Sequence, residues 1–156
     1  MLRDSDPIPS CLLPLRRKAA DLAGVSADSL EQILINEYGP GAGIGWHRDK
    51  PIFQDVIAVS LLAPCLLRLR QKRGDEWERA SCTVHPRSGP LLRGAVRQEW
   101  EHSVPPVEQL RYSVTFRNFA DAGAATLSGE TLQLTEGSIQ LAHKWSAGRG
   151  QRGSRR

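Results

Sequence analysis

Several features that would place the chain in a membrane or outside the cell are missing from its 156 residues. No run of eighteen or more apolar residues occurs, so no segment is long enough to cross a membrane as a helix. Residues 1–10 lack the charged-then-apolar layout of a secretory signal. The three cysteines have no C-x-x-C spacing and cannot all pair, which predicts reduced thiols in a cytoplasmic protein.

Aromatic residues are also few, at 6% of the chain, which leaves few platforms for stacking nucleobases. The formal net charge is +4, but the positive charge is concentrated at one end. Residues 144–156 carry five cations and no acid, which leaves residues 1–143 with a formal net charge of −1. This tail could contact phosphates through counterion release, but a solvated chain end is the favoured interpretation.

The pattern of apolar residues predicts a mainly β protein behind one N-terminal helix. Helical spacing predicts the helix over residues 12–23, with Pro14 in its first turn and Gly24 at its end. Residues 32–38 are typical of a strand, and residues 39–43 of a turn. Many short strands with little helix favour an all-β sandwich or barrel. Further strands are expected at 55–62, 65–71, 77–84, 90–93 and 111–119.

The length fits one domain with a hydrophobic core. We expect a helical segment over residues 1–30 and a β-rich core over residues 31–119. Residues 120–156 turn to Ala, Gly, Ser and Arg and are predicted to form a tail, disordered beyond residue 142. The sequence does not indicate an oligomeric state.

Two histidines and one aspartate form a candidate metal site. His47 and Asp49 are two residues apart, so in extended chain their side chains leave the same face. His102 would come from another part of the fold, which a sandwich closing on itself allows. This facial set leaves three coordination positions open, as in non-haem Fe(II) oxygenases. An H-x-D pair alone is a weak signal, and His85 and His143 show that the chain also carries histidines without evident partners.

Two arginines on one predicted strand suggest a site for a dicarboxylate. Arg111 and Arg117 are six residues apart and therefore share a face, with Cα atoms roughly 20 Å apart. Ser113 and Thr115 lie between them on that face. Two side chains leaning inward could hold a small diacid. The alternative is a solvated strand with surface arginines, which is less convincing for arginines on the inner face of a sheet otherwise made of Val and Phe.

Asn36 and Tyr38 also share a face and could donate hydrogen bonds to carboxylates. With the open metal positions, these groups predict a 2-oxo acid that fills two positions, while O₂ takes the third. Fe(II) suits this chemistry because the reaction needs a redox-active ion, which zinc is not.

The order of these residues resembles the AlkB family of Fe(II)/2-oxoglutarate dioxygenases. The matching motifs are N-x-Y at 36–38, G-x-x-I-x-x-H-x-D at 41–49, V-S-L at 59–61, R-x-x-W-x-H at 97–102 and R-Y-S-V-T-F-R at 111–117. The resemblance implies a double-stranded β-helix, which is jelly-roll-like. It also implies that Arg111 meets the distal carboxylate of 2-oxoglutarate. The implied ligands of the catalytic iron are His47, Asp49 and His102, and the implied 2-oxoglutarate contacts are Asn36, Tyr38, Arg111, Ser113 and Arg117.

The resemblance implies oxidative dealkylation of alkylated nucleic acid bases, in which a hydroxylated N-alkyl group leaves as an aldehyde. Three departures weaken the implied substrate. Pro51 replaces an acid that contacts the damaged base in DNA-repair members, and Ser113 replaces a frequent asparagine. Only thirty-five residues precede Asn36, which leaves little chain for a lid over a flipped base.

Two alternatives therefore stay open: the same chemistry on a protein or small molecule, or a catalytically incomplete, truncated member. Residues 60–69 and 92–97 resemble a lid-poor branch of the family that is associated with protein substrates. Trp46 and Arg48 flank His47 and are candidates for substrate contacts, although a core or strand-edge position is about equally expected for Trp46.

Overall fold

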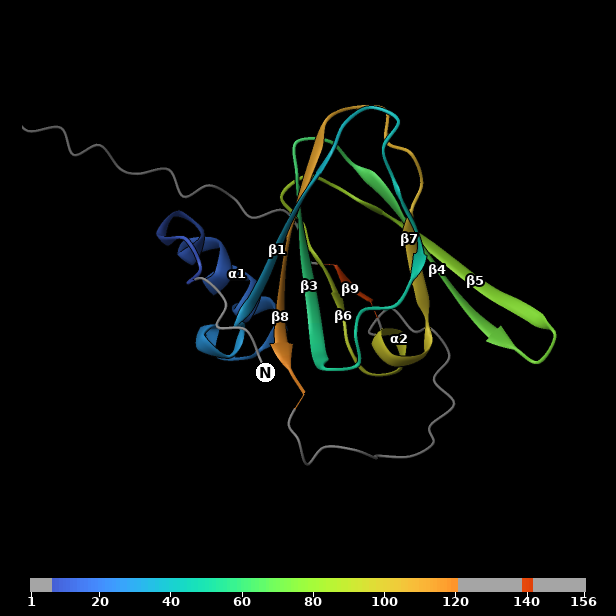
Figure 1. Ribbon diagram of the computed structural model, residues 1–156, viewed down its shortest axis with the longest axis horizontal. Coiled ribbons are helices and arrows are strands. Elements are labelled where there is room, and N and C mark those ends of the chain that lie inside the picture. The colour runs from blue at the N-terminus through green and yellow to red at the C-terminus, as the bar shows by residue number, and fades with distance from the viewer. Residues whose placement is uncertain (1–6, 121–138, 142–156) are drawn as a thin grey trace, which may run out of the picture.

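The computed structural model describes residues 7–120 and 139–141, and it shows two antiparallel sheets packed face to face (Figure 1). The strand order is β1-β8-β3-β6-β9 in the five-stranded sheet and β2-β7-β4-β5 in the four-stranded sheet. This architecture confirms the mainly β, jelly-roll-like fold. The strands are β1 (Gln32–Tyr38), β2 (Ile44–His47), β3 (Phe53–Leu61), β4 (Cys65–Arg73), β5 (Glu76–Val84), β6 (Pro90–Leu92), β7 (Glu101–Val104), β8 (Arg111–Phe119) and β9 (Ile139–Leu141).

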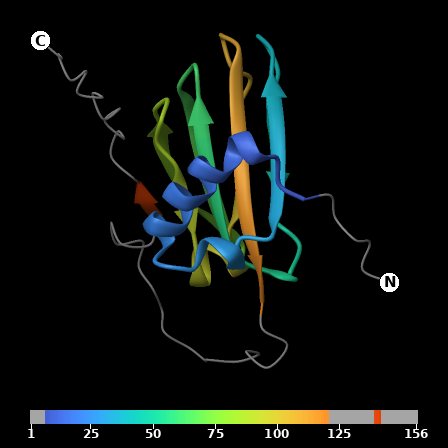
Figure 2. The ribbon, with the colours of Figure 1, turned by 90° about the vertical axis from the view of Figure 1, so that its left-hand side faces the viewer.

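The N-terminal helix α1 (Leu13–Ala23) lies across the outer surface of the five-stranded sheet (Figure 2). Proline occupies its first turn, and Gly24 ends it in the left-handed conformation at φ 64°, which glycine adopts without strain. Ala19, Ala20 and Ala23 are fully buried against the sheet. Their small side chains let the helix backbone approach the strands closely, so α1 is part of the same hydrophobic core as the sheet.

Strand β8 divides its residues between two environments. Val114 and Phe116 face outward into the core beneath α1. The odd-numbered residues from Arg111 to Arg117 face the space between the sheets and line a cavity there. This alternation agrees with the expectation that Arg111 and Arg117 share one face with Ser113 and Thr115.

Three short elements beside the cavity, β2, β7 and α2, were not predicted. Strands β2 and β7 have four residues each, which is too short for a clear alternation. Helix α2 (Gly94–Glu99) has six residues, and no side chain caps its N-terminus, so it carries no start signal. Both strands and the helix flank the cavity region, so the elements missed from sequence are the ones that place its metal-binding candidates.

Strand β9 lies within the predicted tail and pairs with β6, with Ile139 opposite Leu92. The predicted disorder beyond residue 142 falls outside the described residues.

Cys11, Cys65 and Cys82 are free thiols, as predicted. Among the described helices, none has the length and apolar character needed to cross a membrane.

Candidate active site

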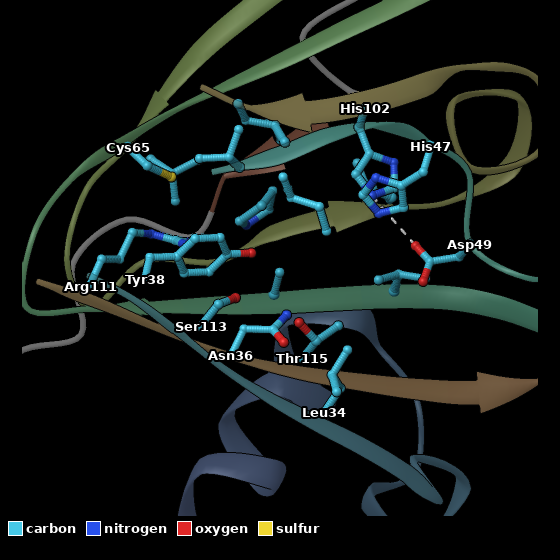
Figure 3. Close-up of a pocket in the computed structure, with 18 of the residues that line it drawn as sticks. Leu34, Asn36, Tyr38, His47, Asp49, Cys65, His102, Arg111, Ser113 and Thr115 are labelled. Carbon is cyan, nitrogen blue, oxygen red and sulfur yellow. Dashed lines mark ion pairs between the residues drawn. The ribbon is translucent and has the colours of Figure 1, made fainter. Parts of the chain in front are cut away.

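A cavity of about 90 Å³ lies between the two sheets (Figure 3). Its volume corresponds to roughly six water-sized spheres, which suits a small acid. Strands β1 and β8 form one wall, while β2, β7 and the residues after β2 contribute to the other. All eight residues predicted to bind the metal or the co-substrate line it: Asn36, Tyr38, His47, Asp49, His102, Arg111, Ser113 and Arg117.

Two histidines face each other across the pairing of β2 with β7. The register places His47 directly opposite His102, and their ring centroids are 4.3 Å apart. His47 Nδ1 lies 2.8 Å from the carbonyl oxygen of Gly45. If Nδ1 carries the proton and donates it to that carbonyl, Nε2 keeps a lone pair for a metal.

The surroundings of His102 keep its ring neutral. Burial lowers the pKa of His102 to about 4, helped by nearby His47, against an opposing influence from Asp49. At neutral pH the ring therefore has a lone pair available, as a metal ligand must. The 3.6 Å approach of its Nε2 to Asp49 Oδ2, dashed in Figure 3, is then a contact with a neutral ring and not an ion pair.

Asp49 is held by Arg117. Arg117 Nε donates to Asp49 Oδ1 over 2.9 Å, and Nη2 forms an ion pair with the same oxygen at 2.7 Å. Arg117 Nη1 donates to Gln32 Oε1 over 2.7 Å. The two side chains are only 10% and 7% exposed. Arg117 is thus engaged with the predicted metal ligand, whereas it was expected to contact a diacid together with Arg111.

The donor set can be tested against an iron ion. Across the described residues, no three or more His, Cys, Asp or Glu side chains form a ready-made metal site. The three predicted ligands nevertheless line one cavity, and Asp49 Oδ2 stands 3.6 Å from His102 Nε2. Neighbouring ligand atoms on an octahedral ion lie roughly 3 Å apart. Two imidazoles and a carboxylate suit Fe(II), so the residues fit the ion in kind and nearly in position.

Arg111 supplies an unsatisfied cation to the same cavity. It is 3% exposed, its Nε donates to Ser60 Oγ over 3.0 Å, and its Cζ lies 4.9 Å from the centre of the Tyr38 ring. Its Nη1 atom is buried and has no hydrogen-bond partner. Leaving a charged donor buried and unpaired is unfavourable, so this atom marks a place for an anionic group. Arg111 lies at the other end of β8 from Arg117, and Figure 3 shows it far from the histidines.

Between the two ends, polar side chains form a continuous row. The register of β1 with β8 sets Asn36 opposite Ser113 and Tyr38 opposite Arg111. Directly opposed residues share a face, so all four side chains reach the cavity. An acid held at Arg111 would lie along this row with its other end toward the histidines.

Arg97 contributes to the site, and sequence reasoning gave it no role. It is 4% exposed and donates through Nη2 to the carbonyl oxygens of Lys50 and Phe53, the latter over 2.9 Å. These bonds hold the loop that follows β2 and carries Asp49. The signal was present in the R-x-x-W-x-H motif, where Trp100 is also buried.

The structure does not bring the two substrate-contact candidates into the cavity. Trp46 is next to His47 on β2 and therefore points to the other side of the sheet, where Arg68 and Arg70 cover it. Arg48 is exposed and donates to the carbonyl oxygen of Gln98 over 3.3 Å.

The sequence of the chain matches a known superfamily. Residues 3–120 match the sequence model of the 2OG-Fe(II) oxygenase superfamily, so the chain belongs to this superfamily. Its cofactors are Fe(II), 2-oxoglutarate and O₂, as predicted. Curated relatives, described next, confirm the resemblance to the AlkB family.

The chain is 31% identical over 99 residues to the Alkylated DNA repair protein ALKBH8 homolog of Arabidopsis thaliana (53% of this chain, 29% of the relative). It is 31% identical over 100 residues to an uncharacterized protein of Acanthamoeba polyphaga mimivirus (56% and 48%). It is 25% identical over 125 residues to the alpha-ketoglutarate-dependent dioxygenase AlkB of Salmonella typhimurium (73% and 57%). The matches thus span between 29% and 57% of these relatives.

Among solved structures, ToxT of Vibrio cholerae aligns with 58% of this chain and 31% of its own, at 12% identity and a TM-score of 0.39. A likeness this low carries no argument about the protein.

Proposed function

We propose that the chain is an Fe(II)- and 2-oxoglutarate-dependent dioxygenase that dealkylates nucleic acid bases. One observation carries the proposal: a single cavity holds two facing imidazoles and a carboxylate near one end, and the unpartnered Nη1 of buried Arg111 at the other. This arrangement matches a metal and a dicarboxylate bound side by side.

In this proposal His47, Asp49 and His102 bind Fe(II), and Arg111 binds the distal carboxylate of 2-oxoglutarate. Bound Fe(II), with 2-oxoglutarate and O₂, supplies the hydroxylation of a C–H bond with release of succinate and CO₂. The chain's own contribution is positioning. Asn36, Tyr38 and Ser113 would lie along the co-substrate between the two sheets, and Arg117 would hold Asp49 at the edge of the same cavity.

Nucleic acid is the favoured substrate class because two relatives are named for DNA repair or for AlkB. A protein or small molecule is the second candidate. It is favoured by exposed Pro51, which offers no acid to a base at the position where DNA-repair members carry one.

The three free thiols support the predicted cytoplasmic location.

The enzyme class is tested by succinate formation from 2-oxoglutarate with added Fe(II). We expect metal-dependent turnover in the natural chain and its loss in His47→Ala. His85→Ala is the matched control, because His85 is exposed and lies outside the cavity. Circular dichroism establishes that each variant is folded. Absence of metal-dependent turnover in folded natural protein would rule the activity out.

The substrate class is tested by formaldehyde release from N-methylated single-stranded oligonucleotides. Release that requires both Fe(II) and 2-oxoglutarate is the expected result. Succinate formation without formaldehyde from any methylated oligonucleotide would keep the oxygenase and reject the nucleic acid substrate. Methylated peptides would then be tested in the same assay.

A further inference from the structure

The β4–β5 hairpin carries a cationic surface on the side away from the cavity. The register sets Arg68 opposite Ser81, Arg70 opposite Arg79 and Lys72 opposite Trp77, so these side chains share one face. The alternate residues of β4 from Cys65 to Gln71 point inward and are buried. We call this surface the outer face and define it by the outward residues of the two strands: Leu66, Arg68, Arg70, Lys72, Trp77, Arg79, Ser81 and Thr83.

Most cations of the hairpin lie on one face, and Arg73 is the exception, paired with Glu78 on the inner face. The outer face holds four cations and no acid. The acids of β5, Glu76 and Glu78, stand opposite Arg73 and Gln71 and so belong to the inner face. One acid of the neighbouring strand β7, Glu101, accepts from Arg70 Nε over 2.6 Å. Because residues 1–143 have a formal net charge of −1, this concentration of cations is a local feature.

Two tryptophans are interleaved with these arginines. The Cζ atom of Arg70 lies 4.4 Å from the ring centre of Trp46 and 4.2 Å from that of Trp77. Arg68 Cζ lies 5.0 Å from Trp46, and its Nε donates to Ser103 Oγ over 3.0 Å. These contacts hold both guanidinium groups in place, so less side-chain freedom is lost when a ligand binds.

A groove of about 440 Å³ follows the outer face, lined by Trp46, Leu66, Arg68, Leu69, Arg79, Ala80 and Ser81. This volume lies in the range of small-molecule sites. Lys72 and Arg79 are exposed, and within the described part of the chain neither makes an ion pair. Figure 1 shows the hairpin projecting from the body, which leaves the outer face open to a large partner.

We propose that the outer face binds single-stranded nucleic acid, with Lys72 and Arg79 on phosphates and Trp77 stacking on a base. Cations interleaved with aromatic rings along a groove are how sequence-tolerant single-strand sites are built. An acidic protein segment would use the cations but would gain little from the tryptophans, so nucleic acid fits better.

The position of the outer face relates it to the cavity. Strand β2 is an edge of the four-stranded sheet, with Trp46 on the outer side and His47 on the inner side. A single-stranded nucleic acid that runs across the outer face from β5 to β2 therefore reaches the sheet edge that carries His47. This link to catalysis rests on the proposed function, whereas the binding itself does not.

The test is fluorescence anisotropy of a labelled oligothymidylate titrated with the full chain across a salt series. All proteins carry Arg149, Arg152, Arg155 and Arg156 changed to Gln, so the cationic tail does not dominate. Lys72→Glu with Arg79→Glu should raise Kd by about tenfold or more. It should also reduce the steepness of log Kd against log salt concentration by about 1.4, which is about 0.7 for each of the two lost phosphate contacts. The matched control, Arg17→Glu with Arg87→Glu, makes the same charge change at exposed positions off the hairpin and should change Kd less than about twofold.

A second variant separates stacking from charge. Trp77→Ala should raise Kd at least about fivefold, and Trp77→Phe should recover part of the loss, because a smaller ring still stacks. Equal weakening by the hairpin and control pairs would overturn the proposal. The proposal would also be overturned if a polyglutamate of matched charge competed as well as the unlabelled oligonucleotide, since such competition marks a site for acidic protein segments.

The two proposals fail separately. Binding through the outer face without formaldehyde release from methylated oligonucleotides would keep this inference and reject the proposed substrate. Formaldehyde release that is undiminished in the Lys72→Glu, Arg79→Glu pair at low oligonucleotide concentration would keep the substrate and overturn the link between the outer face and catalysis. The anisotropy measurement decides the binding itself.

Discussion

Two arginines six residues apart on one face of β8 are in different electrostatic situations. Arg117 is neutralised by Asp49, whereas Arg111 has a hydroxyl partner and a buried nitrogen without any partner. The spacing of the two residues cannot distinguish these states, because the difference comes from what the other sheet places opposite each one. The proposed roles differ accordingly, with Arg111 binding an anion and Arg117 holding a metal ligand.

Arg111→Ala should raise the 2-oxoglutarate concentration needed for half-maximal turnover by about ten- to a hundredfold. Hydrogen bonds to charged groups contribute about 1.5–3 kcal/mol, which sets this range. Succinate formation is measured against 2-oxoglutarate concentration, and Fe(II) affinity is measured in parallel. Iron affinity should stay within about threefold, because Arg111 lies at the far end of the cavity. Equal loss of both would mean that Arg111 supports the fold instead.

Arg117→Met should lower the free energy of unfolding by about 3 kcal/mol without metal, because it leaves Asp49 charged, buried and unpaired. Urea unfolding is measured with and without Fe(II) under anaerobic conditions. Fe(II) should reduce the deficit, since the ion supplies a new counter-charge. Arg73→Met is the control: its pair with Glu78 is about half exposed, and the change should be below about 1 kcal/mol. A deficit that metal leaves unchanged would argue against Asp49 as a ligand.

At the scale of elements, a short helix decides where the Asp49 loop lies. Helix α2 presents Arg97 to the carbonyl oxygens of Lys50 and Phe53, on either side of the turn between β2 and β3. Burial lowers the pKa of Arg97, with Asp49 opposing this effect. The guanidinium group of Arg97 nevertheless keeps its charge at neutral pH, because arginine is not deprotonated in proteins.

Arg97→Gln should weaken Fe(II) binding by about ten- to a hundredfold in protein that remains folded, because outer partners of a ligand segment tune metal affinity. Isothermal titration with Fe(II) under anaerobic conditions measures the effect. Gln98→Ala, an exposed change on the same helix, is the matched control and should bind iron as the natural chain does. Unchanged affinity in folded Arg97→Gln would remove Arg97 from the site.

At the scale of the whole molecule, the sandwich determines which thiols are reachable. Cys11 is exposed, whereas Cys65 is buried and Cys82 is half-buried. Burial raises the pKa of the Cys65 and Cys82 thiols. Because a raised pKa leaves less thiolate at any pH below it, these two thiols are protected both sterically and chemically.

At pH 8 the native chain should therefore show one fast thiol with a disulfide reagent such as Ellman's reagent, and three after denaturation. The fast phase should disappear in Cys11→Ser. The slow phases should accelerate as the pH rises toward 9 and above, because the raised pKa of the Cys65 and Cys82 thiols leaves their thiolate fraction still increasing there. Two or more fast thiols in the folded chain would contradict the packing around β4 and β5.

Local patterns were enough to predict much of the fold. Strand β1 has the bounds predicted for it, and α1 ends at Gly24 as predicted, because alternation, proline and glycine act over a few residues. The elements of four to six residues, β2, β7 and α2, were missed, since their lengths are set by contacts with other strands. Trp46 was misplaced because β2 was missed: alternation along that strand turns His47 into the cavity and Trp46 to the opposite side.

The sequence by itself determined the cofactors, Fe(II) and 2-oxoglutarate, which the superfamily match bears out, and it set the types and order of the residues proposed to bind them. Only the tertiary structure decided the geometry. It set His47 opposite His102, joined Arg117 to Asp49 and left Arg111 Nη1 without a partner. The reason is physical: a side chain's type is a local property, whereas its partner is chosen by the packing of two sheets whose residues are distant in sequence.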